Sequence, residues 1–94
     1  MKSFESVVIL KPRKEEDEKI KEIGNKIKEI VADPDMEIDI VGNKKLAYPI
    51  KQQTEGYFIQ YYFKTDADKV TELENYYRSE DEVLKYIVIR IEEE

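Results

Sequence analysis

The apolar residues of this 94-residue chain recur with two different periods, and the order of those periods limits the fold more than any other feature. Alternating apolar residues, or short runs of β-branched and aromatic residues, are typical of strands, whereas spacings of three and four are typical of amphipathic helices. The predicted strands are residues 3–10, 36–41 with a continuation at 45–50, 56–63 and 83–91. The predicted helices are residues 15–33, ended by Pro34, and a segment that begins at Thr65 or Asp66 and carries Val70, Leu73 and Tyr76 or Tyr77.

This order of strand, helix, strand, strand, helix, strand predicts an α+β fold of the ferredoxin-like, or split βαβ, type. Four antiparallel strands form one sheet, and both helices pack on the same face. Right-handed crossovers place the first and third strands in the centre of the sheet. The length is that of one small domain, so we expect residues 1–94 to form a single unit.

Both faces of the predicted sheet carry apolar residues. One face, expected to meet the helices, consists of Phe4, Val8, Leu10, Tyr57, Ile59, Tyr61, Phe63, Leu84, Tyr86 and Val88. The opposite face, called the open face below, carries Val7, Ile9, Phe58, Tyr62, Ile87 and Ile89. Two helices cover only one face. Either strand propensity has made the open face more apolar than it needs to be, or a partner protein covers it.

Composition argues against an enzyme. The chain has no cysteine and no histidine, which removes thiolate chemistry, the commonest general base and the commonest metal ligand. We therefore expect no catalytic residue, metal, cofactor or small-molecule substrate. An acylphosphatase-like enzyme of the same fold would need a glycine-containing phosphate loop after the first strand, and Arg13 stands there without a glycine. No apolar run reaches the roughly 20 residues of a membrane span, and the N-terminus lacks the basic-then-apolar pattern of a signal peptide, so we expect a soluble, cytoplasmic protein.

Charge is unevenly distributed along the chain. A net charge of -6 opposes general attraction to nucleic acid, but residues 40–54 contain Lys44, Lys45 and Lys51 and no acidic residue. These lysines either protect an edge strand from aggregation or form a local footprint for a polyanion. Phe58 and Tyr62 on the third strand are candidates for base stacking, although the surrounding sequence matches the RNA-recognition motif poorly. A stand-alone domain that binds single-stranded RNA on its open face is therefore one alternative.

The segment Lys44-Lys45-Leu46-Ala47-Tyr48-Pro49-Ile50, followed by a polar turn and Gly56-Tyr57, resembles the hallmark of the bacterial small-subunit ribosomal protein six family. The family pattern is close to Arg-Arg-Leu-Ala-Tyr-Pro-Ile, a short polar turn, then Gly-Tyr. The opening MKSFESVVILKP and the closing YYRSEDEVLKYIVIR are also similar to the family, so the resemblance covers nearly the whole chain. Lysine in place of both arginines keeps the charge but loses bidentate geometry.

The resemblance implies a structural constituent of the small ribosomal subunit. Such a protein binds the central domain of 16S-type ribosomal RNA together with ribosomal protein eighteen, during assembly of the subunit platform, without catalysis. The implied RNA-binding residues, together with the lysines and turn residues noted above, are Lys2, Phe4, Lys44, Lys45, Lys51, Gln52, Gln53, Lys85 and Arg90. The open face is the expected seat of the partner protein, while the acidity of the chain helps to recruit that basic partner.

Two glycines are assigned structural roles. We expect Gly24 to allow close packing of the first helix against the sheet. We expect Gly56 to adopt a backbone conformation that residues with a Cβ avoid.

Overall fold

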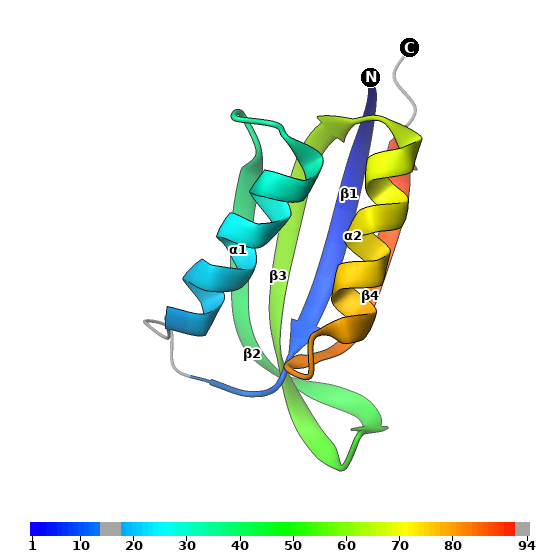
Figure 1. Cartoon of the computed structure of the whole chain (residues 1–94). Helices are drawn as coiled ribbons and strands as arrows, with labels where there is room; N and C mark the ends of the chain where they lie inside the picture. Colours follow the sequence, from blue (N-terminus) through cyan, green and yellow to red (C-terminus); the bar gives the residue numbers. More distant parts are fainter. Residues whose placement is uncertain (14–17, 92–94) are drawn as a thin grey trace.

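The computed structural model describes residues 1–13 and 18–91 and contains the six predicted elements in the predicted order (Figure 1). The predicted helix start at Glu15 and the acidic residues 92–94 lie outside the described residues. The elements are β1 (Lys2–Leu10), α1 (Glu18–Val31), β2 (Glu37–Ile50), β3 (Gln53–Thr65), α2 (Ala67–Ser79) and β4 (Val83–Ile91). The predicted ferredoxin-like fold is confirmed.

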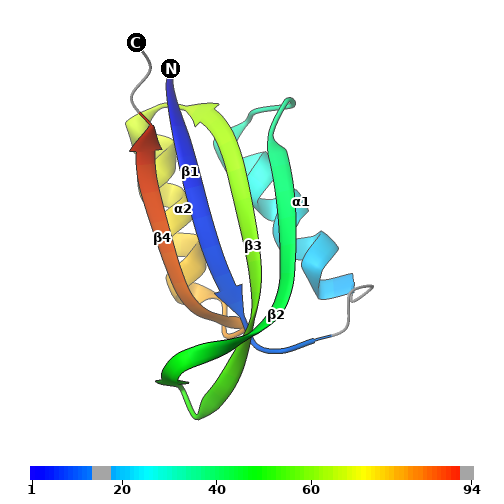
Figure 2. The same cartoon turned by 180° about the vertical axis from the view of Figure 1, so that it is seen from behind.

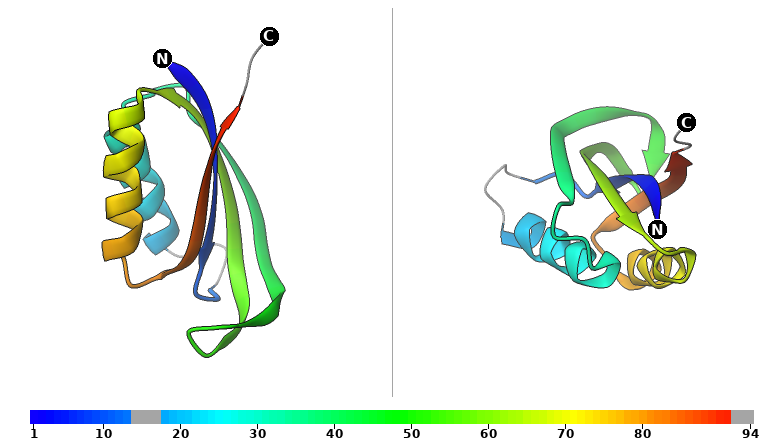
Figure 3. Two further views of the ribbon diagram at one scale, coloured as in Figure 1. Left: turned by 90° about the vertical axis from the view of Figure 1, so that its right-hand side faces the viewer. Right: turned by 90° about the horizontal axis from the view of Figure 1, so that it is seen from above.

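The four strands form one antiparallel sheet with the order β2-β3-β1-β4, so β1 and β3 are central as predicted. Both helices lie on one face, and no helix covers the other face (Figures 2 and 3). Val8 sets the register in the middle of the sheet, because it lies opposite Ile59 of β3 and Tyr86 of β4.

The core lies between the sheet and the two helices. Every second residue of β1 is buried, and the same alternation continues along β3, which confirms the predicted assignment of the strand residues to the two faces. The buried cluster consists of Phe4, Val8, Leu10, Ile20, Ile23, Ile27, Val31, Tyr57, Ile59, Tyr61, Phe63, Leu73, Tyr77 and Val83. Ser6 is also fully buried, and its hydroxyl lies 2.8 Å from that of Tyr77. Burial raises the pKa of Tyr77, so this phenol stays neutral and hydrogen-bonded inside the core.

The β2–β3 hairpin differs from the prediction. The two predicted pieces of the second strand form one continuous strand, and β3 begins at Gln53, three residues before the predicted start. The turn consists only of Lys51 and Gln52, with φ angles of 48° and 68°. Two consecutive left-handed residues are typical of a type I′ turn, whose usual Asn-Gly signal is absent from this chain. The prediction failed here because the local residues do not indicate the turn.

The glycines have roles that differ in part from those expected. Gly24 is buried, but a Cβ there would lie 3.9 Å from the side chain of Ile38, an ordinary contact, so the packing of α1 does not require glycine as expected. Gly56 does not have a positive φ, so the expected backbone conformation was wrong. Its need for glycine is steric, since a Cβ would lie 2.4 Å from Cγ2 of Ile9. The glycine with a left-handed backbone is Gly42, at φ 98°.

Candidate nucleic-acid interface

The β2–β3 hairpin extends beyond the ends of β1 and β4 (Figure 3). Lys45 pairs with Glu55 and Ile50 pairs with Gln53, so the four residues 46–49 of β2 lie opposite Thr54 alone. This large bulge contains most of the Leu-Ala-Tyr-Pro-Ile segment. Because a bulge interrupts the ladder of hydrogen bonds, Pro49 is tolerated although it has no amide hydrogen to donate.

The bulge turns across the lower end of the open face, toward β1 and β4 (Figure 2). There it encloses a hollow of about 180 Å³, which we call the Tyr48 pocket. The pocket is lined by Ile9, Lys45, Leu46, Ala47, Tyr48, Ile50, Phe58 and Lys85. Leu46 of the bulge packs beside Gly56, where a Cβ would lie 3.4 Å from its side chain, an ordinary contact.

Tyr48 and Lys85 meet at the rim of the pocket. The ammonium group of Lys85 donates to the hydroxyl of Tyr48 at 3.4 Å and lies 6.0 Å from the centroid of its ring. Tyr48 nevertheless remains 60% exposed, which is unusual for a large aromatic side chain held by its neighbours. An exposed ring beside a cation suits the binding of an anionic, aromatic group.

The predicted RNA-binding residues fall into two groups at opposite ends of the sheet. The hairpin group consists of Lys44, Lys45, Lys51, Gln52, Gln53 and Lys85. Lys2, Phe4 and Arg90 lie at the other end, near the chain termini (Figure 1). Lys85 and Arg90 are five residues apart on β4, about 17 Å, and an odd spacing places their side chains on opposite faces of the sheet. The structure therefore does not join these residues into one continuous patch.

The end near the termini offers less aromatic surface than expected. Lys2 and Arg90 line the same shallow hollow. Phe4 is only 8% exposed, belongs to the core and stacks on Phe63 with ring centroids 6.0 Å apart. Little of its ring is therefore accessible to RNA.

Two hairpin lysines have neighbours that the sequence did not reveal. The ammonium group of Lys51 donates to the carbonyl of Val83 at 3.3 Å and thereby ties the turn to the start of β4. Glu55 is the cross-strand partner of Lys45, so a carboxylate follows closely on the neighbouring strand although residues 40–54 contain none. Lys44 pairs with Gly56 and is exposed.

The open face has opposite charges at its two ends. Val7, Ile9, Phe58 and Tyr62 are half-buried, and Ile87 and Ile89 are 46% and 51% exposed. Tyr62 lies opposite both Glu5 and Glu37, one on each neighbouring strand. Partial desolvation and then the carboxylates of Glu5, Asp39 and Glu37 raise the pKa of Tyr62. The end of the open face around Tyr62 is therefore acidic, whereas the end around the Tyr48 pocket is basic.

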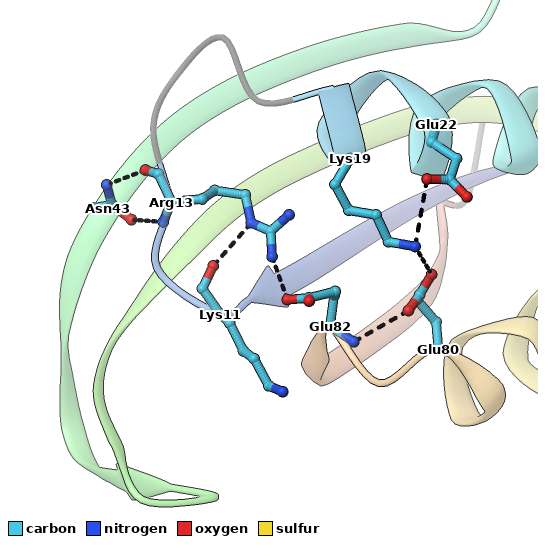
Figure 4. Close-up of polar contacts among 7 residues, drawn as sticks. All are labelled: Lys11, Arg13, Lys19, Glu22, Asn43, Glu80 and Glu82. Carbon is cyan, nitrogen blue, oxygen red and sulfur yellow. Dashed lines mark hydrogen bonds and ion pairs between the residues drawn. The ribbon is translucent and has the colours of Figure 1, made fainter.

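Arg13 serves a structural role after β1 (Figure 4). Its side chain is only 7% exposed, its guanidinium forms an ion pair with Glu82, and its Nε donates to the carbonyl of Lys11 at 3.1 Å. Asn43 of β2 exchanges two hydrogen bonds with the Arg13 backbone, at 3.2 Å and 2.7 Å. The arginine that an acylphosphatase-like site would require is thus occupied by an internal carboxylate.

A second ion pair joins α1 to the end of α2. Nζ of Lys19 lies 2.7 Å from a carboxylate oxygen of Glu80, whose side chain is 14% exposed (Figure 4). Partial burial raises the pKa of Glu80, but the hydrogen bonds from Lys19 and from the Glu82 amide outweigh it. The pKa of Glu80 is therefore lowered. A carboxyl whose pKa is lowered by folding stabilises the fold above its unfolded pKa, and this stabilisation is lost as the pH falls through the folded pKa.

Glu80→Gln should therefore lower the free energy of unfolding at neutral pH by about 1 kcal/mol and flatten its decline in the acid range. Urea denaturation of wild type and variant between neutral pH and the acid range measures both effects. Glu22→Gln is the matched control, because Glu22 contacts the same lysine at 3.5 Å but its side chain is 67% exposed. If the free energy of unfolding fell equally with pH in wild type and in Glu80→Gln, the proposed role of the Glu80 carboxylate would be wrong.

The described part of the chain offers no group of acidic side chains suited to hold a metal ion. Neither α1 nor α2 has the length and apolar character that a membrane crossing demands. The residues that sequence reasoning missed are Tyr48 and the bulge around it. The Tyr-Pro pair was visible in the sequence, but nothing local indicated that it folds over the open face.

Comparison with known proteins agrees with this geometry. The family model for ribosomal protein S6 matches residues 3–90. Small ribosomal subunit protein bS6 of Caldanaerobacter subterraneus subsp. tengcongensis is 36% identical, covering 99% of this chain and 100% of the relative. The corresponding protein of Clostridioides difficile is 35% identical over 95% of this chain and 98% of its own length. The crystal structure of 30S ribosomal protein S6 from Thermotoga maritima has a TM-score of 0.81 and 29% identity, covering 96% of this chain and 87% of that one. The chain therefore belongs to the ribosomal protein S6 family of the small ribosomal subunit.

Proposed function

We propose that the chain binds the central domain of 16S-type ribosomal RNA together with ribosomal protein eighteen during assembly of the subunit platform. The observation that carries this proposal is the charge distribution of the uncovered sheet face. Lys45 and Lys85 stand at its hairpin end, and Glu5, Glu37 and Asp39 stand at its other end. One surface therefore has a part that suits a polyanion and a part that suits a basic protein. The chain acts in the cytoplasmic ribosome and performs no catalysis.

The RNA footprint consists of the hairpin group, supplemented by Lys2 and Arg90 at the far end. A net charge of -6 means that these few cations act against a general repulsion from RNA. We therefore expect weak binding of the chain alone and much tighter binding of the pair, because a basic partner offsets the repulsion. The decisive experiment is a gel-shift titration of a central-domain RNA fragment with the chain, with the partner, and with both. Tight binding of the chain alone at physiological salt would contradict the proposal.

The partner's seat is the apolar part of the open face, formed by Val7, Ile9, Phe58, Tyr62, Ile87 and Ile89. A row of partly exposed apolar side chains beside carboxylates is suited to a protein with a basic, partly apolar docking surface. In this arrangement the acidic residues give orientation, and the apolar residues give most of the affinity.

A second candidate is a stand-alone domain that stacks single-stranded RNA on Phe58 and Tyr62. Both rings are half-buried on the open face, so part of each ring is accessible. The same gel-shift titration separates the two candidates. Stacking on this face would make RNA and partner compete, whereas the ribosomal proposal requires them to cooperate.

Lys44→Ala and Lys45→Ala should weaken RNA binding by the paired complex about equally for all RNA sequences. Each change should also lower the slope of log K against log salt by about 1, because each lysine neutralises one phosphate. Lys26→Ala is the control, since Lys26 is exposed on α1, on the far side of the sheet. Unchanged slopes for both hairpin variants would leave these lysines with only the role of protecting an edge strand.

A further inference from the structure

The Tyr48 pocket combines features that the RNA-binding residues alone do not explain. Its floor is apolar, its rim carries the exposed ring of Tyr48, and the side chains of Lys45 and Lys85 complete the lining. We propose that this pocket takes one unstacked RNA base, with the two lysines bound to the phosphates beside it. The inference rests on the proposed function and deepens it by assigning a base subsite at Tyr48, which shares Ile9 and Phe58 with the border of the partner's proposed docking surface.

The choice of RNA over a protein side chain follows from charge. The pocket lining contains two lysines and no carboxylate, since Glu55, the cross-strand partner of Lys45, is not part of it. The carboxylates of the open face, those of Glu5, Glu37 and Asp39, surround Tyr62 at the other end of the sheet. A phosphate is therefore attracted to the pocket and repelled from the Tyr62 end, and a basic protein has the opposite preference.

The aromatic part of the pocket is arranged before any ligand arrives. The bulge at 46–49 carries Tyr48 across the sheet, and the contact with Lys85 holds the ring in place. Stacking on an aromatic ring beside cations is the usual way in which single-stranded nucleic acid is bound without sequence preference. Apart from Tyr48 and the lysines, the lining side chains are apolar, so the pocket should accept any of the four bases.

The first test measures the affinity of the complex with ribosomal protein eighteen for the central-domain RNA fragment. Tyr48→Ala should weaken binding about tenfold or more, whereas Tyr48→Phe, which keeps the ring and loses only its hydrogen bond to Lys85, should weaken binding much less. Thermal melts show whether each variant is folded, and the 60% exposure of Tyr48 favours folding of both. Equal affinities of wild type and Tyr48→Ala would overturn the base subsite but not the proposed function. Failure of the wild-type complex to bind the RNA would overturn both.

The second test identifies the occupant of the pocket. Ring resonances of Tyr48 are followed by NMR while the full chain is titrated with uridine monophosphate, adenosine monophosphate or ribose 5-phosphate. We expect both nucleotides to shift the Tyr48 ring and ribose 5-phosphate to leave it unchanged. A shift by all three compounds would indicate a phosphate site without base stacking and would overturn the proposal. A Tyr48 ring shielded by the partner protein in the absence of RNA would also overturn it, because the pocket would then hold a protein side chain.

Discussion

Gly56→Val should lower the free energy of unfolding by about 3 kcal/mol, at the upper end of the range for an overpacked site. A Cβ at position 56 would lie 2.4 Å from Cγ2 of Ile9, which is closer than real side chains tolerate. Ile9 cannot rotate away easily, because a β-branched side chain has few χ1 rotamers. Valine also lowers the conformational entropy of the unfolded chain, but this offsets only about 0.4–1 kcal/mol of the destabilisation. Urea denaturation at neutral pH measures the difference.

Gly24→Ala is the matched control for this prediction. Gly24 is also a buried glycine, but a Cβ there would meet Ile38 at 3.9 Å, an ordinary contact. Alanine is preferred over glycine inside a helix by about 1 kcal/mol, so this variant should be more stable than wild type. Wild-type stability of Gly56→Val would show that Ile9 and the bulge can move apart, and the steric role of Gly56 would then be wrong.

The role of Gly56 also explains a sequence pattern. Ile9 and Leu46 both approach position 56, one from the central strand and the other from the bulge. A Cβ at position 56 would clash with Ile9 at 2.4 Å but would meet Leu46 at 3.4 Å, an ordinary contact, so it is the packing against β1 that requires glycine. The spacing between the Leu-Ala-Tyr-Pro-Ile segment and the Gly-Tyr pair reflects a contact between the two arms of one hairpin. The same contact forms one side of the Tyr48 pocket.

Most of the fold could be predicted from the sequence because it depends on local periodicity. The alternation in β1 and β3 identified the face that packs on the helices, and the prediction for the open face followed from it. The prediction for β4 was incomplete, because the pairing of β1 with β4 shifts register between Ile9 and Leu10. This shift brings Val83 into the core in addition to the expected residues. The buried Ser6 was not predicted either, since its hydrogen bond to Tyr77 joins residues far apart in sequence.

The candidate site was harder to predict because its features depend on contacts over long distances in the sequence. No local signal shows that residues 46–49 lie opposite one residue of β3, or that Lys51 and Gln52 form the turn with left-handed backbones. The neighbours of Tyr48 in the pocket come from β1, β3 and β4 as well as from its own strand. The charges were visible in the sequence, but their separation to opposite ends of one face required the strand register.

Phe58→Asp should weaken pairing with ribosomal protein eighteen by about 2 kcal/mol or more if this ring is a hot spot of the interface. Phe58 lies on the central strand β3 within the open face, where the partner's proposed docking surface borders the Tyr48 pocket. Its half-buried ring faces away from the helices, so the substitution should cost the monomer only about 1 kcal/mol, mainly through strand propensity. Calorimetric titration of the folded variant with the partner, without RNA, measures pairing separately from any effect on the Tyr48 pocket.

Gln60→Glu is the control for the added charge, because Gln60 lies two residues further along the same strand and face. It introduces a carboxylate without removing a ring, and it keeps the oxygen that accepts the hydrogen bond from the Tyr62 hydroxyl at 2.7 Å. A basic partner should bind this variant at least as well as wild type, since the added charge extends the acidic end of the open face. Equal weakening by both variants would assign the effect of Phe58→Asp to charge and not to the lost ring. Normal pairing of folded Phe58→Asp would place the partner elsewhere, for example along the exposed edge of β2.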